Sequence, residues 1–145
     1  MKKIKQPFKF FDVTADIGFI AFGNTINESF ENAGLAMFNV ISDTTNIAKN
    51  KEFDFFIESE DEVSLLYDFL EELLFLHEIE FMLFSDFKVK ISKNDNNFRL
   101  DAKIKGEEIN WDIHERGSEI KAITYHLMNV SVNEGFYEVK GIFDL

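Results

Sequence analysis

Residues 8–41 read FKFFDVTADIGFIAFGNTINESFENAGLAMFNVI, and they contain both kinds of pattern from which the fold class is predicted. Aromatic and β-branched residues dominate Phe8–Val13 and Ile17–Phe22, so each run predicts a strand. Thr25, followed by Glu28 three residues later, forms a capping-box pattern that begins a helix. The apolar residues after it recur at helical spacing: Phe30, Ala33, Met37, Phe38 and Ile41.

The same two patterns continue through the rest of the chain. Phe53–Ile57 predicts a short strand, and Ser59 with Glu62 forms a second capping box ahead of the strongest helical pattern. The residues of this second helix that we expect to face the core are Val63, Leu66, Phe69, Leu70, Leu73 and Leu74.

Beyond residue 80 the pattern is that of strands. Apolar and polar residues alternate over 87–91 and 98–104, on both sides of an Asn-Asp-Asn-Asn turn, which predicts a hairpin. Ile120–Val132 and Phe136–Phe143 predict a last strand pair joined by a turn at 133–135. We therefore expect an α+β fold in one domain over residues 1–145, with two helices packed on mostly antiparallel sheets of about seven or eight strands.

Composition and charge narrow the functional classes. The chain has 145 residues, with 15 Lys and Arg against 27 Asp and Glu, a formal net charge of −12. Phosphate backbones are bound mainly through basic residues, so we do not expect direct strong binding to nucleic acid. The acidity suits a basic protein surface or cations as partners, but taken by itself it more simply keeps the protein soluble. No apolar run is long enough to span a membrane, and no signal peptide or cysteine is present, which predicts a cytoplasmic protein.

Carboxylates at strand ends are the candidates for chemistry. Asp12 and Asp16 bracket a break between the first two predicted strands, and Asp144 closes the last one. If they converge, they repel one another unless a cation or proton lies between them, and all-oxygen ligands suit a hard divalent ion. The alternative is that they form turn hydrogen bonds. The neighbours of Lys121 from Ile120 to Thr124 carry no other charge, so Lys121 faces solvent or balances the acids.

These residues belong to motifs that resemble those of the archease family. Residues 12–18, Asp-Val-Thr-Ala-Asp-Ile-Gly, resemble its Asp/Glu-His-Thr-Ala-Asp-Ile-Gly signature, and residues 119–126, Glu-Ile-Lys-Ala-Ile-Thr-Tyr-His, resemble its most diagnostic stretch. Further similar segments occur in the family's order at 65–74, 84–87, 106–107 and 142–145. Two residues depart from the pattern: Val13 replaces the usual His, and Phe69 replaces the usual Trp of the long helix.

The resemblance implies a specific function. Archeases are accessory proteins of the tRNA-splicing RNA ligase, which joins tRNA halves through a 3′-phosphate or 2′,3′-cyclic phosphate, and they promote guanylylation and multiple turnover of that ligase. By resemblance, Asp16, Asp144 and Leu145, the last through its carboxylate or carbonyl, would bind a divalent ion, calcium or else magnesium. Asp12, Lys121 and His126 would serve activation.

Two other classes of function stay open. One is a metal-dependent phosphoesterase in which Asp12, Asp16 and Asp144 hold the ion and Lys121 stabilises charge; turnover without the ligase would favour it. The other is a generic chaperone-like binding protein, which affinity for many unfolded clients would favour. The three histidines, His77, His114 and His126, are scattered, and a structural role is the default for each.

Overall fold

The computed structural model describes residues 4–145, and within this range the chain forms two α-helices and two antiparallel sheets. The elements follow in the order β1 (Phe8–Val13), β2 (Asp16–Gly23), α1 (Ile26–Ile41), the short 3₁₀ helix η1 (Thr44–Asn46), β3 (Lys51–Ser59), α2 (Glu62–Ile79), β4 (Met82–Asn94), β5 (Asn97–Glu108), β6 (Ala122–Asn133) and β7 (Phe136–Asp144). The four-stranded sheet has the order β1-β2-β7-β6, and the three-stranded sheet has the order β3-β5-β4. The predicted α+β class is confirmed, with seven strands.

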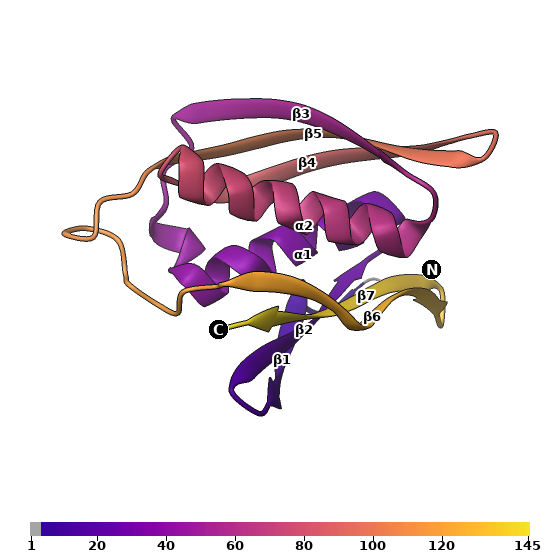
Figure 1. The fold of residues 1–145 in the computed structure, drawn as a ribbon, viewed down its shortest axis with the longest axis horizontal. Helices are drawn as coiled ribbons and strands as arrows, with labels where there is room; N and C mark the ends of the chain where they lie inside the picture. The colour runs from indigo at the N-terminus through magenta and orange to yellow at the C-terminus, as the bar shows by residue number, and fades with distance from the viewer. Residues whose placement is uncertain (1–3) are drawn as a thin grey trace.

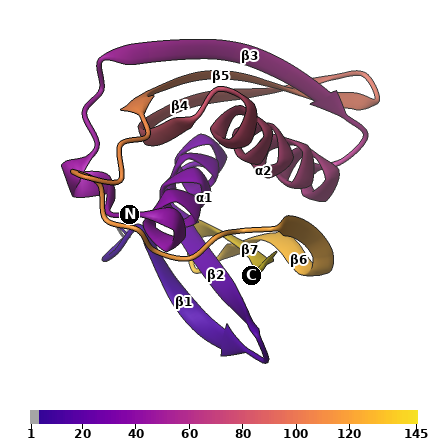
Figure 2. The same ribbon diagram turned by 60° about the vertical axis from the view of Figure 1, so that its left-hand side comes forward.

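The two helices lie between the two sheets, as Figures 1 and 2 show. Helix α1 packs against β2 on one side and β4 on the other, while α2 packs against β6 and β3. Each sheet therefore buries one face against the helices and turns the other face outward. No helix in residues 4–145 is both long and apolar enough to cross a membrane.

The core forms where the apolar stripes of the helices meet the inner faces of the sheets. The stripe predicted for α1 is buried, with Phe30, Met37 and Phe38 fully inaccessible. Phe38 makes edge-to-face contacts with Phe84 of β4 and with the ring of His77 on α2. Aromatic rings thus join the helices to the three-stranded sheet.

The helix starts confirm one capping prediction and correct the other. Thr25 is the N-cap of α1, and its hydroxyl accepts the Glu28 N–H; the Glu28 carboxylate, however, accepts the N–H of Asn24 and not that of Thr25. The N-cap of α2 is Asp61, so the prediction for Ser59 is wrong. Ser59 remains in β3, where its hydroxyl donates to Asp68, and Asp61 lies at the position from which a carboxylate reaches the Ser64 N–H.

The hairpin of β4 and β5 contains a close approach of two backbones. A Cβ atom on Gly106 would lie 1.8 Å from the Leu83 carbonyl oxygen, beside the irregularity in strand register between Phe84 and Asp86. Only glycine fits there without displacing the neighbouring strand. The predicted turn between these strands is confirmed.

Candidate functional site

The candidate site lies at the end of the four-stranded sheet where the β1–β2 turn meets the last residues of β7. Val13 pairs with Asp16 across a two-residue turn in which Ala15 has φ 64°. Asp16 pairs in turn with Asp144, so the two carboxylates project from directly opposite positions on neighbouring strands. The Leu145 N–H donates to Asp16 Oδ1 at 3.1 Å. The structure therefore brings together the three residues predicted to bind a metal.

These carboxylates face away from the helices. Ile17, Phe143 and Ile123 lie side by side on three strands and pack into the core. Because side chains alternate along a strand, Asp16 and Asp144 project from the outer face of the sheet. Both are half-buried. Like charges directly opposite one another in a sheet are destabilising, so this pair reduces stability unless something neutralises it.

The glycine of the 12–18 motif has a packing role beside this pair. Gly18 lies two residues after Asp16 on the same outer face, and a Cβ atom on Gly18 would lie 2.2 Å from atoms of the Phe11 ring. The Phe11 ring lies over Gly18, and the Lys140 ammonium lies 5.3 Å from the centre of that ring. The glycine allows β1 to cover this part of the outer face.

Asp12 is separated from the carboxylate pair by the sheet itself. It pairs with Ile17, so alternation directs its side chain to the face opposite that of Asp16 and Asp144, and it is exposed. The sequence suggested that Asp12 and Asp16 could converge. The strand register shows that only Asp16 joins Asp144.

Lys121, just before β6, lies close to the Asp16–Asp144 pair, and His126 lies farther along the strand. Lys121 immediately precedes β6, is exposed, and donates its backbone N–H to the Asp144 carbonyl at 2.7 Å. His126 lies within an irregularity of β6, between Thr124 and Asn129, where the pairing with β7 is interrupted. It too is exposed, and its backbone N–H donates to the Thr124 hydroxyl. The fold thus anchors Lys121 beside Asp144 and places His126 farther along the same strand.

The donor set suits a hard cation but is small. Among residues 4–145, no group of three or more His, Cys, Asp or Glu side chains is arranged to hold a metal ion. The pair supplies two carboxylates, and the backbone of Leu145 is the third candidate donor. Oxygen ligands of this kind select calcium or magnesium over zinc. A bound ion would need water or a partner to complete its coordination.

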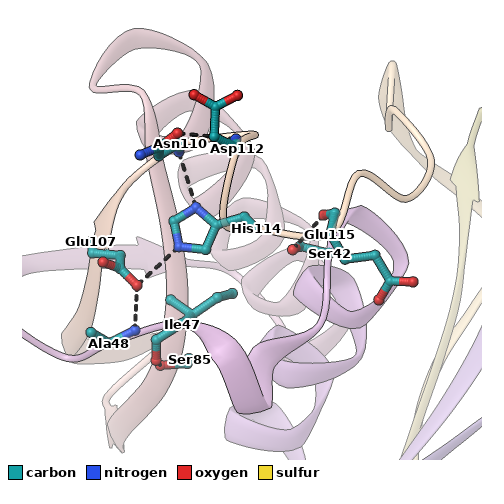
Figure 3. A network of polar contacts seen from close by, with 9 residues as sticks. All are labelled: Ser42, Ile47, Ala48, Ser85, Glu107, Asn110, Asp112, His114 and Glu115. Carbon is teal, nitrogen blue, oxygen red and sulfur yellow. Dashed lines mark hydrogen bonds and ion pairs between the residues drawn. The ribbon is translucent and has the colours of Figure 1, made fainter.

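Sequence reasoning missed a buried polar network around His114, shown in Figure 3. His114 is only 4% exposed. Its Nδ1 accepts the Asn110 backbone N–H at 3.0 Å, so the proton of the neutral ring is on Nε2, which donates to Glu107 at 2.9 Å. Glu107 also accepts the Ala48 N–H. Nothing local in the sequence distinguishes this histidine from the other two.

The network fixes the loop that leads to Lys121. Hydrogen bonds from Ala48 and then from His114 lower the pKa of Glu107 below its usual value. The Ser42 hydroxyl donates to the Glu115 carbonyl, and Gly117 and Ser118 donate their N–H groups to carbonyls of α1. The loop from β5 to β6 is therefore held along its length, which positions Lys121 at the end of β7.

The fold and site define a class: a two-helix, two-sheet α+β protein with an acidic pair at one sheet end. A model of the Archease protein family matches residues 8–145. The protein archease of Methanothermobacter thermautotrophicus is 51% identical over 97% of this chain and 99% of its own length. The archease of Pyrococcus furiosus is 47% identical over 86% of this chain and 88% of its own length. The chain belongs to the archease family.

Solved structures agree with this assignment. The solution structure of a Methanobacterium thermoautotrophicum protein superposes with a TM-score of 0.87 at 50% identity, covering 96% of this chain and 99% of that one. A crystal structure of a Thermotoga maritima archease, described as a possible chaperone, superposes with a TM-score of 0.60 over the full length of both chains. At 20% identity the latter shows the fold alone. These relatives are named as archeases or as a possible chaperone, and neither is the name of an enzyme.

Proposed function

We propose that this protein activates a tRNA-splicing RNA ligase by promoting its guanylylation and multiple turnover in the cytoplasm. Family membership supports the class of function, and the convergence of Asp16, Asp144 and Leu145 carries the proposal for the site. The pair is destabilising by itself and lies on an outer sheet face, where a ligand or a partner can reach it.

In this proposal each residue has a limited role. Asp16 and Asp144, together with an oxygen of Leu145, would hold a divalent ion, calcium or magnesium, which would supply positive charge for phosphate oxygens. Lys121, whose backbone N–H donates to the Asp144 carbonyl, adds an exposed cation at this end of the sheet, and Asp12 and His126 extend the contact with the ligase. The protein does not itself form or break a bond. It presents charge to the nucleotide pocket of the ligase.

A guanylylation assay tests this function. Substoichiometric amounts of the protein should raise both the rate of guanylylation and the number of ligation turnovers. Lys121→Ala should lose most of this activation while melting like the natural protein, because an exposed side chain changes stability by no more than about 0.5 kcal/mol. Lys49→Ala, an exposed lysine remote in sequence from the site, is the matched control. A ligase unaffected by the natural protein would exclude the function, and a fully active Lys121→Ala would remove that residue from it.

A chaperone-like role is the second candidate. The large exposed apolar side chains of this chain favour it. In that case the protein would reduce aggregation of several unrelated unfolded proteins at similar concentrations. The first proposal expects no such general protection.

A further inference from the structure

The outer flank of α2 exposes large apolar side chains. Phe75 and Ile79 are four residues apart and so lie on one face of the helix, and Phe81 follows the helix end. Their exposed fractions are 54%, 57% and 69%. In Figure 1, α2 lies in front of α1, and no strand or loop is drawn across the front of α2. We call Phe75, Ile79 and Phe81 the apolar triad.

Phe81 occupies a conformation that does not suit it. Its φ is 56°, in the left-handed region where helices usually end in glycine or asparagine. A bulky residue there is strained, and strain of this kind is concentrated at functional sites. Burial does not compensate, because the side chain is the most exposed of the triad. Neither local conformation nor packing of the core explains a phenylalanine at position 81.

The charge around the triad is of one sign. Residues 61–81, which comprise α2 with its two caps and Phe81, contain seven Asp and Glu and no Lys or Arg. Within residues 4–145, no acidic residue of α2 forms an ion pair. Glu78 and Glu80 lie at the C-terminal end of the helix, where acids are unfavourable because of the helix dipole. Burial raises the pKa of the Tyr67 hydroxyl, and the charge of Glu71 raises it further.

We propose that the apolar triad and the acids around it dock a basic amphipathic segment of a partner protein. Such a segment would cover the three exposed side chains and place its cations against carboxylates that have no counter-charge within the described chain. A second copy of this chain is disfavoured, because it would bring two acidic flanks together. The inference deepens the proposed function by naming a contact surface for the ligase, and it rests on that function.

The most discriminating variant is Phe81→Gly. Glycine adopts a positive φ without strain, so the variant should melt at a higher temperature than the natural protein. If Phe81 contacts the partner, the same variant should bind it more weakly. If Phe81 instead stabilises the fold, Phe81→Gly should melt at a lower temperature than the natural protein. If Phe81 has no role in binding, the variant should bind the partner as tightly as the natural protein does.

Binding is measured with a synthetic amphipathic helix of leucine and lysine as the probe. Phe75→Ser combined with Ile79→Ser should weaken binding about tenfold, in the range expected when buried anchors are lost. Glu71→Lys combined with Glu78→Lys should weaken it and reduce its dependence on salt. Val132→Ser, at an equally exposed apolar residue of β6, and Glu115→Lys, at an exposed loop acid, are the controls. They should bind like the natural protein.

The outcomes separate this inference from the proposed function. If the natural protein does not bind the peptide, or if the triad and charge variants bind it as tightly as the natural protein does, the inference is wrong. The Phe75→Ser, Ile79→Ser variant is the triad variant. If it activates the ligase at the same concentrations as the natural protein does, the inference is also wrong, and the proposed function stands. If the triad variant loses peptide binding but no ligase responds to the natural protein, the docking surface stands and the proposed function fails. The proposal would also be overturned if the natural protein associates with itself and does not bind the peptide, and if the triad variant no longer self-associates. In that case the surface binds a second copy of this chain.

Discussion

The outer faces of the two sheets carry their charges in different arrangements. On the three-stranded sheet, the acids of β3 lie opposite bases of β5: Glu52 faces Lys105, Asp54 faces Lys103 and Glu58 faces Arg99. On the four-stranded sheet, Asp16 faces Asp144. Opposite charges across strands stabilise a sheet by about 0.2–1 kcal/mol per pair, and like charges destabilise it. The first face neutralises itself, whereas the second leaves two acids together.

This difference in charge pairing points to the four-stranded sheet as the location of the functional site. The three-stranded sheet has one like-charged pair, Lys88 opposite Lys103, but Asp54 lies on the other side of Lys103. The neighbours of the Asp16–Asp144 pair within its row are Val13 and Ala122, neither of which is charged. An arrangement that lowers stability, with no opposite charge beside it in its row, is typical of a functional site.

The largest effect we expect contrasts the glycines of the two sheets. Gly106→Ala should lower the free energy of unfolding by about 3–4 kcal/mol, because the new Cβ atom would overlap backbone of β4. Gly18→Ala should lower it by about 1–2 kcal/mol, because the Phe11 ring in its way is a side chain that can turn aside. Urea denaturation measures both. Equal losses, or the reverse order, would contradict the packing described for the two faces.

A smaller effect should follow from pH at the end of the three-stranded sheet. The pKa of Glu107 is lowered from 4.5 in the folded state, so its charge stabilises the fold above about pH 4.5. This contribution should be lost as the pH falls further through the folded pKa. Glu107→Gln keeps an oxygen for the N–H groups of Ala48 and His114 but cannot titrate. The free energy of unfolding should therefore fall less between about pH 7 and pH 3 in the variant than in the natural protein. An identical pH dependence would show that this carboxylate contributes nothing.

The smallest effect we expect comes from neutralising single carboxylates, which should change the free energy of unfolding in opposite directions on the two sheets. In chelator, Asp144→Asn should raise the free energy of unfolding by about 0.5 kcal/mol, because a like-charge pair is removed. Glu52→Gln should lower it slightly, because Glu52 lies near Lys103 and Lys105, at 3.9 and 3.8 Å.

Calcium should distinguish the Asp16–Asp144 pair from the paired charges of the three-stranded sheet. It should raise the melting temperature of the natural protein and of Glu52→Gln by mass action, but not that of Asp16→Asn or Asp144→Asn. A segment fused after Leu145 should weaken the response, because it crowds the site. Melting curves of the natural protein that do not respond to calcium or chelator would exclude an ion at this pair.

Local patterns in the sequence were enough to predict the elements and to recognise the family. Strand and helix periodicities are properties of adjacent residues, so β1 was predicted at its observed bounds, and Thr25 was identified as the cap of α1. The motifs at 12–18 and 119–126 are also contiguous, which is why the family resemblance could be recognised without a structure.

Which of these residues come into contact depends on the fold of the whole chain. Asp12 and Asp16 are close in sequence, yet the register of β1 and β2 places them on opposite faces of the sheet, while Asp144 from the far end of the chain lies opposite Asp16. The burial of His114 depends on Glu107, seven residues away, and the exposure of Phe81 on how α2 packs. Register and packing are set by contacts between distant segments, and no local pattern encodes them.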